Sequence, residues 1–246
     1  MIDLHCHILP GVDDGAGSLD DACRMARLAA ESGVSVIVAT PHCNLPNQTP
    51  NYRSAELYQQ FNNLNQVFRE QKIPVQVLPG AEVFARDNLE ELLAGHRVNT
   101  LNRSHYLLTE FYFGEPANVL SSALRSVRRA GYIPVVAHPE RYEAVQQDPG
   151  LAVGWFRDGY IIQLNKGSIL GRLGSGAKHC AMWLLDHGFA HVIASDAHSP
   201  EYRTTYMKTL TNLLLDYYPE EYVRLLLVDN PQRIIEDRSI PIPGFD

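Results

Sequence analysis

Nine histidine, aspartate and glutamate residues in this chain occur in short clusters that are typical of metal-binding sites. The nine are His5, His7, Asp14, His42, Glu82, Glu110, His138, Asp196 and His198. Neutral imidazole nitrogens and carboxylate oxygens are good ligands for divalent ions such as Mn, Fe or Zn, whereas a closed structural zinc site prefers cysteine. Because nine ligands are too many for one ion, they would suit two or three ions with open positions for water and a substrate.

Two members of this set have a second interpretation. Asp14 belongs to an Asp-Asp-Gly triplet, which is also an ordinary turn sequence. Glu110 could orient a ligating histidine instead of binding an ion itself. We expect the other histidines to be ordinary surface or core residues; these are His96, His105, His179, His187 and His191. His105 and His191 precede their predicted strands, so they should lie on the face opposite the clusters.

Seven short apolar runs rich in β-branched residues predict the strands that must hold these ligands. Near-continuous apolar character is typical of strands buried on both faces of a parallel sheet, and the runs are 2–5, 34–40, 75–78, 106–110, 133–137, 160–164 and 191–195. The stretches between them predict helices at 18–32, 54–71, 118–130, 177–187, 204–216 and 220–227. This alternation favours a single α/β domain over residues 1–246, built as a (β/α) barrel, with a doubly wound open sheet as the alternative.

Six of the seven predicted strands have a histidine or an acidic residue at their carboxyl ends. In a parallel barrel those ends converge on one face, which is where active sites lie. Side chains two residues apart in an extended segment point to the same side, so His5 and His7 would face one ion together. The same holds for Asp196 and His198. The sequence therefore predicts a site for several metal ions at one rim of the barrel.

The overall charge and the cysteines argue against several other functions. The chain has 246 residues, and its formal charge of 21 − 28 = −7 provides no basic surface for nucleic acid or anionic membranes. No apolar run reaches the length of about 18 residues that would cross a bilayer. The four cysteines show no paired short spacing, and the opening Met1-Ile2-Asp3 is unlike a secretory leader. We therefore expect a cytoplasmic protein with neither a nucleic-acid partner nor a membrane-inserted segment.

The motifs around the predicted ligands resemble those of the PHP (polymerase and histidinol phosphatase) superfamily. The resemblance covers essentially the whole chain and rests on His5-Cys6-His7, Asp13-Asp14-Gly15, Pro41-His42, Gly80-Ala81-Glu82, His138-Pro139-Glu140-Arg141-Tyr142 and Ser195-Asp196-Ala197-His198. The opening DLHCHILPGVDDGA and the central AHPERY are similar to segments of the capsule-type, CpsB/YwqE-like bacterial manganese-dependent protein tyrosine phosphatases. Related PHP proteins often carry histidine where this chain has Glu110, which leaves the ion preference at that position open.

This resemblance implies a distorted (β/α)7 TIM-like barrel, the PHP fold, and a site for three divalent metal ions. Manganese is the first expectation, with Fe, Zn or Mg as alternatives. The first ion would be held by His5, His7, Glu82 and Asp196, and the second by Glu82, Glu110 and His138, so that Glu82 bridges the two. The third would be held by Asp14, His42 and His198.

The same resemblance implies hydrolysis of phosphotyrosine by metal-activated water, on the tail of a bacterial capsule or exopolysaccharide tyrosine kinase. Arg141 is the first candidate for binding the phosphoryl oxygens and Arg203 the second, because a guanidinium can bind phosphate in a bidentate manner. A cysteine phosphatase is excluded, since no cysteine is followed by arginine six residues later, and the absence of Asp-x-Asp excludes an aspartyl-phosphate mechanism. The alternative is a PHP phosphoesterase for a small metabolite such as histidinol phosphate; the net charge of −7 disfavours a PHP nuclease.

Overall fold

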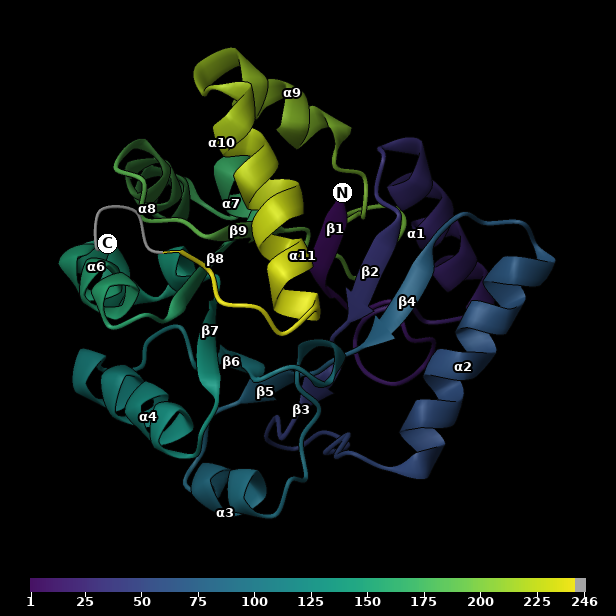
Figure 1. Ribbon diagram of the computed structural model, residues 1–246, viewed down its shortest axis with the longest axis horizontal. Coiled ribbons are helices and arrows are strands. Elements are labelled where there is room, and N and C mark those ends of the chain that lie inside the picture. Colours follow the sequence, from purple (N-terminus) through teal and green to yellow (C-terminus); the bar gives the residue numbers. More distant parts are fainter. Residues whose placement is uncertain (242–246) are drawn as a thin grey trace.

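The chain alternates parallel strands with helices that lie around them (Figure 1). The computed structural model describes residues 1–241, so residues 242–246 of the expected domain lie outside the described part. The strands are β1 (Ile2–Cys6), β2 (Val36–Ala39), β3 (His42–Cys43), β4 (Gln76–Pro79), β5 (Glu82–Phe84), β6 (Tyr106–Glu110), β7 (Ile133–Ala137), β8 (Ile161–Asn165) and β9 (Val192–Ala194).

The helical segments differ widely in length. The longer helices are α1 (Leu19–Glu31), α2 (Ala55–Glu70), α4 (Ala117–Arg129), α6 (Gly150–Arg157), α8 (Ser175–Asp186) and α9 (Lys208–Tyr217). The shorter ones are α3 (Leu89–Ala94), α5 (Glu143–Gln147), α7 (Lys166–Ile169), α10 (Glu220–Arg224) and α11 (Asn230–Ile235). Single turns lie at η1 (Leu101–Arg103) and η2 (Pro139–Arg141), and a π-helical turn, η3 (Leu225–Asp229), joins α10 to α11.

The strands form two hydrogen-bonded parallel sheets. One has the order β1-β2-β4 and the other the order β3-β5-β6-β7-β8-β9. The fold is therefore α/β with parallel sheets, and residues 1–241 contain no closed barrel of the kind expected from the sequence.

Two interruptions separate the sheets. Thr40 and Pro41 end the first sheet before β3, and Gly80 and Ala81 do the same before β5. Proline has no N–H for strand pairing. At Gly80 the backbone comes so close to β2 that a Cβ would lie 2.7 Å from Val38 Cγ1. The chain thus leaves the first sheet after β2 and after β4, and each time it continues in the second.

All seven predicted strands are present, with ends shifted by no more than two residues. The sequence missed β3 and β5, which have two and three residues and are too short to show the alternation of a strand. The predicted helix at 220–227 ends at Arg224 and is followed by η3 and α11. Helix α6 was missed because Gly150 and Gly154 give it a low helix propensity.

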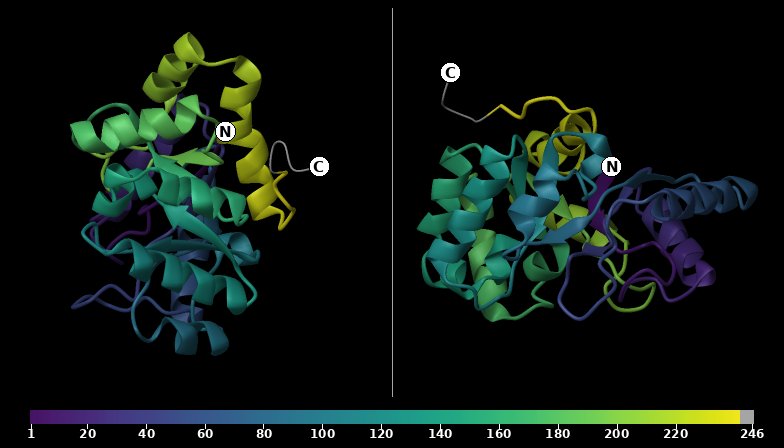
Figure 2. Two further views of the ribbon diagram at one scale, coloured as in Figure 1. Left: turned by 90° about the vertical axis from the view of Figure 1, so that its left-hand side faces the viewer. Right: turned by 90° about the horizontal axis from the view of Figure 1, so that it is seen from below.

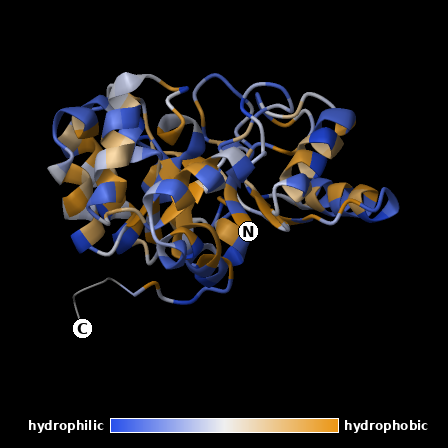
Figure 3. Cartoon of the chain, turned by 90° about the horizontal axis from the view of Figure 1, so that it is seen from above, coloured by the Kyte–Doolittle hydropathy of each residue, from blue (hydrophilic) through white to orange (hydrophobic). Residues whose placement is uncertain are grey.

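The helices surround the strands (Figure 2). They carry both hydrophobic and hydrophilic residues (Figure 3), and their buried apolar residues pack into the core. Helix α1 shows how the sequence sets this arrangement. The Ser18 hydroxyl caps its first turn by accepting a hydrogen bond from Asp21 N, and the helix buries Ala22, Met25 and Ala29. Among residues 1–241, no helix has both the length and the apolar character needed to cross a membrane.

Candidate metal centre

The nine predicted ligands meet in one cluster, most of them at or beyond the carboxyl end of a strand, whereas His42 and Glu82 begin the short strands β3 and β5. His5 lies on β1, Glu82 on β5 and Glu110 at the end of β6, while His138 and Asp196 follow β7 and β9. Their ligand atoms form four overlapping groups, in each of which all atoms lie within 4.8 Å of one another: His7, Asp14, His42 and His198; His5, His7 and Asp196; His5, Glu82 and His138; and His42, Glu82 and Glu110. One group contains the whole of the third ligand set implied by the resemblance, and the other two sets are divided between groups.

Glu82 lies at the centre of this cluster. Its Oε1 is 3.1 Å from His5 Nε2 and 3.1 Å from His138 Nε2. Its Oε2 is 3.1 Å from His42 Nδ1 and 3.3 Å from His7 Nε2. Burial opposes ionisation of this carboxylate, but the charges of His5 and His42 and the histidine hydrogen bonds outweigh burial and hold the pKa of Glu82 well below its ordinary value. A carboxylate that faces two histidines with each oxygen can bridge two ions.

Two of the ligand atoms in the cluster lie close together without forming a hydrogen bond. His42 Nδ1 and Glu110 Oε2 lie 3.3 Å apart, yet both atoms are buried and neither has a hydrogen-bond partner among the described residues. Buried polar atoms are normally hydrogen-bonded. Imidazole and carboxylate donors that come this close without pairing therefore fit divalent cations.

Asp14 lies at the outer end of the cluster. Its Oδ1 is 3.5 Å from His42 Nε2 and 3.5 Å from His198 Nε2, and its side chain is 55% exposed. Burial, with the added charge of His7, lowers the pKa of His198 to about 2. This imidazole therefore stays neutral near pH 7 and is available as a ligand. Of the nine clustered residues, Asp14 is the one that is exposed to solvent.

Asp13, the residue beside this ligand, has a role that the sequence analysis missed. Its Oδ2 lies 2.7 Å from His7 Nδ1 and accepts a hydrogen bond from His42 N at 2.9 Å. Its Oδ1 accepts a hydrogen bond from Gly15 N at 3.0 Å. A carboxylate that holds the second ring nitrogen of a ligating histidine fixes the tautomer and the orientation of the ring. The Asp-Asp-Gly triplet is the available signal, but the ligands predicted from the sequence include only Asp14 of its two aspartates.

Gly15 allows the loop to bring Asp13 to this position. A Cβ at Gly15 would lie 2.1 Å from His7 O and 2.5 Å from His7 Cβ, so no larger residue fits without movement of the backbone. Ala16 N donates a hydrogen bond to His7 O at 2.9 Å. The loop therefore folds back directly onto the histidine that Asp13 orients.

Strand β8 supplies further supporting residues that the sequence analysis missed. Gln163 Oε1 lies 2.9 Å from His5 Nδ1, which leaves His5 Nε2 directed at the cluster. Asn165 Nδ2 donates a hydrogen bond to Asp196 Oδ2 at 2.5 Å. Both are buried polar residues in an otherwise apolar strand, and this alternation was the signal that could have identified them.

Two cluster residues have a left-handed backbone conformation. His138 has φ 34° and Asp196 has φ 48°. Residues other than glycine rarely adopt this region, and the associated strain is most common at functional sites. Each residue closely follows the end of a strand, and the turn brings its side chain into the cluster.

Both predicted phosphate-binding arginines lie at the edge of the cluster. Arg141 Nη1 is 3.5 Å from Asp196 Oδ2, and Arg203 contacts the same oxygen. The guanidinium of Arg141 lies 4.2 Å above the ring of Phe113. That ring in turn is 6.0 Å from the ring of His138. The two guanidinium groups reach the cluster from segments far apart in the sequence.

The histidines expected to be ordinary belong to none of the four groups found among the described residues. His105 pairs with Asp237 on the surface, at 2.7 Å. His191 is buried, stacks on Phe156 with ring centroids 4.4 Å apart, and accepts a hydrogen bond from Ile162 N. Burial lowers the pKa of His191 to about 4, so it is a neutral core residue.

Comparison with known proteins identifies relatives along almost the whole chain. A family model described as capsular polysaccharide synthesis, CpsB/CapC, matches residues 1–236. The chain is similar to the tyrosine-protein phosphatase YwqE of Bacillus subtilis, with 33% identity over 240 residues, covering 98% of this chain and 93% of the relative. It is also similar to the tyrosine-protein phosphatase CpsB of Streptococcus pneumoniae, with 30% identity over 246 residues, covering 98% and 100%.

A solved structure shares the fold. It comes from a crystallographic description of YwqE from Bacillus subtilis and CpsB from Streptococcus pneumoniae as metal-dependent tyrosine phosphatases. The TM-score is 0.88 at 33% identity, and the match covers 98% of this chain and 96% of the other.

Proposed function

The chain belongs to the CpsB/CapC family of capsular polysaccharide synthesis, and from this premise we propose that it is a metal-dependent protein-tyrosine phosphatase. The observation that carries the proposal is the convergence of five histidines and four carboxylates, with Glu82 at their centre. Relatives that match at least 93% of their own length are tyrosine-protein phosphatases. The proposal therefore rests on the activity named for those relatives and on a cluster of possible metal ligands in this chain.

The nine clustered residues would hold up to three divalent ions, with manganese as the first expectation. Support comes from the four overlapping groups and from the bridging position of Glu82. When bound, divalent ions lower the pKa of coordinated water to about 7 and neutralise charge on phosphoryl oxygens. Imidazole and carboxylate ligands suit Mn, Fe or Zn, and the carboxylates also admit Mg.

Arg141 and Arg203 would bind the phosphoryl oxygens of the substrate. Both guanidinium groups lie against Asp196 at the edge of the cluster, and a guanidinium can donate two parallel hydrogen bonds to phosphate. Phe113 holds Arg141 in place from the other side. The 39% of Phe113 that remains exposed gives the aromatic ring of a phosphotyrosine an apolar surface to pack against.

We regard the two sheets as parts of one distorted (β/α)7 barrel in a single domain. The support is an isolated parallel bridge between Cys6 and Ala197, together with a hydrogen bond from His7 N to Ala197 O at 2.9 Å. These contacts connect the end of β1 with the segment after β9. A barrel of this kind gathers the ends of its strands at one rim, where the ligands lie.

We further propose that the substrate is the tyrosine-bearing tail of a bacterial capsule or exopolysaccharide tyrosine kinase, and that the protein acts in the cytoplasm. The family description places the chain in capsular polysaccharide synthesis. Its four cysteines are free and buried, which agrees with a reducing compartment.

Removal and return of metal test the proposed function. Chelator-treated protein should lose hydrolysis of p-nitrophenyl phosphate and of a phosphotyrosyl peptide, and added Mn²⁺ should restore both. His138→Ala should abolish activity while circular dichroism shows a retained fold, and His179→Ala, an exposed position on α8, should leave activity unchanged. Full activity after chelation, or turnover of histidinol phosphate but of no phosphotyrosyl peptide, would refute the proposal.

A further inference from the structure

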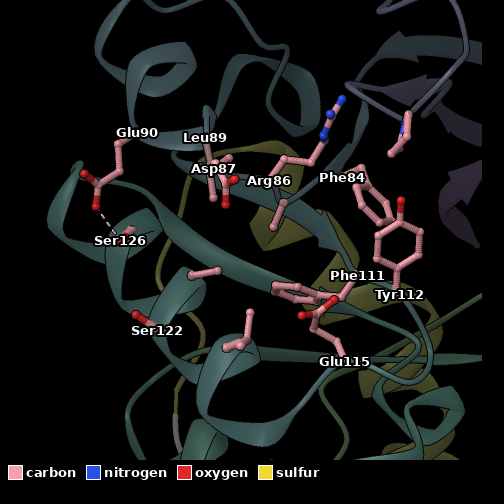
Figure 4. Close-up of a pocket in the computed structure, with 14 residues that line it drawn as sticks. Phe84, Arg86, Asp87, Leu89, Glu90, Phe111, Tyr112, Glu115, Ser122 and Ser126 are labelled. Atoms are coloured by element: carbon pink, nitrogen blue, oxygen red, sulfur yellow. Dashed lines mark hydrogen bonds between the residues drawn. The ribbon is translucent and has the colours of Figure 1, made fainter.

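A cavity of about 530 Å³ is lined by residues that follow the ligands Glu82 and Glu110 in the chain, and Figure 4 shows its lining. Its walls come from the segment after β5, from the segment after β6, and from helices α3 and α4. The lining residues that matter here are Phe84, Arg86, Asp87, Phe111, Tyr112 and Glu115.

One short segment connects this cavity to the metal centre. Glu110 belongs to the ligand cluster, and Phe111 and Tyr112, which follow it, form part of the cavity wall. The next residue, Phe113, lies beneath the guanidinium of Arg141, and Glu115 returns to the cavity. A peptide with its phosphotyrosine bound at Arg141 would therefore have its neighbouring residues within reach of the cavity.

Strand β5 makes the same connection from the other side. Glu82 is at the centre of the cluster, and Phe84, two residues later, lines the cavity. The rings of Phe84 and Tyr112 meet edge to face with centroids 4.6 Å apart, and Tyr112 is 54% exposed. Phe84 itself is only 3% exposed, so Tyr112 provides the accessible aromatic surface for a side chain that enters the cavity.

The charge of the cavity is mainly negative. Glu90 is already hydrogen-bonded to Ser126 at 2.7 Å and to Arg129 at 3.2 Å. Asp87 and Glu115 have no hydrogen-bond or ion-pair partner for their carboxylates within residues 1–241. In Figure 4 the guanidinium of Arg86 extends away from both of these carboxylates. Two unpaired carboxylates beside aromatic rings are complementary to a long cationic side chain.

We propose that this cavity is a substrate subsite that binds a lysine or arginine side chain flanking the phosphotyrosine of a peptide. The apolar stem of such a side chain would pack on the exposed ring of Tyr112, and its cationic end would be attracted by Asp87 and Glu115. The inference rests on the proposed function, because a flanking residue exists only in a peptide or protein substrate. A small aryl phosphate reaches the metal centre but not the cavity.

The subsite would make the enzyme selective by charge. The phosphate binds among the arginines, whereas an acidic residue beside the phosphotyrosine would face Asp87 and Glu115 and be repelled. Exposed ion pairs contribute modestly, so we expect a preference of roughly two- to fivefold in kcat/KM from each carboxylate. The preference should appear mainly in KM, since the pairing does not involve the reacting atoms.

Steady-state kinetics of the Mn²⁺-loaded protein test the subsite. The substrates are p-nitrophenyl phosphate, phosphotyrosyl peptides in which a single lysine is moved through the flanking positions, and the same peptides with glutamate in its place. Wild type should prefer lysine at one or more positions. Asp87→Asn combined with Glu115→Gln should remove the preference and leave p-nitrophenyl phosphate turnover unchanged.

A matched control separates the subsite from the total charge of the protein. Glu31→Gln combined with Asp216→Asn removes two carboxylates at exposed positions on α1 and α9, and this variant should keep the preference. Equal kcat/KM for lysine and glutamate peptides in wild type, or an unchanged preference in the cavity variant, would overturn the subsite. The subsite would also be overturned if the cavity variant lost p-nitrophenyl phosphate turnover to the same extent as turnover of the lysine peptides. Failure of wild type to hydrolyse any phosphotyrosyl peptide would instead overturn the proposed function, and the subsite with it.

Discussion

Replacement of Asp13 by alanine should weaken metal binding without unfolding the protein. Asp13 is not among the predicted ligands, yet its carboxylate accepts hydrogen bonds from the backbone of His42 and of Gly15 and lies 2.7 Å from His7 Nδ1. Its removal frees the His7 ring to rotate and to change tautomer, so that Nε2 no longer points at the cluster.

The size of the effect follows from these contacts. Burial opposes ionisation of Asp13, but the hydrogen bond and charge of His7 and the backbone N–H groups outweigh it and lower the pKa of Asp13 from 3.8 to about 2. At about 1.4 kcal/mol for each tenfold change in proton affinity, the change from 3.8 to about 2 corresponds to about 2.5 kcal/mol. Loss of such a supporting carboxylate typically costs roughly 10- to 100-fold in metal affinity, which is about 1.4 to 2.8 kcal/mol. The first value describes how strongly ionised Asp13 is held by its partners, and the second describes what its loss should cost in metal binding.

Titration calorimetry with Mn²⁺ on chelator-treated protein measures this change directly. Asp13→Ala should raise Kd by the factor given above, Asp13→Asn should have a smaller effect because its amide oxygen can still accept a hydrogen bond, and Asp20→Ala on the exposed start of α1 should have none. Circular dichroism should show the same fold in all three. An unchanged Kd in Asp13→Ala would refute the argument that this carboxylate orients His7.

Protonation, guanidinium geometry and a buried lysine each lead to a further expected outcome. Burial disfavours the charged form of His7, but the neighbouring carboxylates outweigh burial and raise its pKa from 6.5 to about 9. The free energy of unfolding of metal-free protein, measured in urea, should therefore fall as pH rises from 6.5 to about 9. A free energy of unfolding that does not change over this pH range would contradict the expectation. Arg141→Lys should lower kcat/KM for p-nitrophenyl phosphate roughly tenfold with metal content unchanged, because lysine donates no paired hydrogen bonds; equal kcat/KM would show that Arg141 does not bind phosphate. Lys166 is 3% exposed and donates hydrogen bonds to the backbone carbonyls of Thr204 and Tyr206. Lys166→Met should therefore lower the free energy of unfolding by about 1–3 kcal/mol, measured by urea or thermal unfolding. An unchanged free energy of unfolding would show that these hydrogen bonds do not stabilise the fold.

The sequence was informative about the cluster because the predicted ligands occupy positions fixed by local geometry. His5 and His7 are two residues apart on an extended segment, and the other candidates lie at or just beyond the ends of apolar strands. The carboxyl ends of parallel strands share one edge in any α/β fold, so the residues could be placed together without knowledge of the full topology. That argument did not depend on whether the sheet closes, and it holds although the strands form two sheets.

The supporting residues could not be found in the same way, because their roles depend on contacts between distant segments. Gln163 meets His5 across 158 positions of sequence, and no local pattern marks that pair. Asp13 and Asp14 are equivalent in sequence, and only the close approach of Gly15 to His7 decides which carboxylate turns inward. The cavity beside the cluster is likewise formed by segments of several different elements.

The cluster also lies where the two sheets meet. His5 stands on β1 of the first sheet, whereas Glu82 and His138 belong to the second sheet and to the segment that follows one of its strands. An ion held by these three side chains would be a cross-link between halves that share few backbone hydrogen bonds. Binding of such an ion would therefore hold the two sheets together at their junction, in addition to its chemistry.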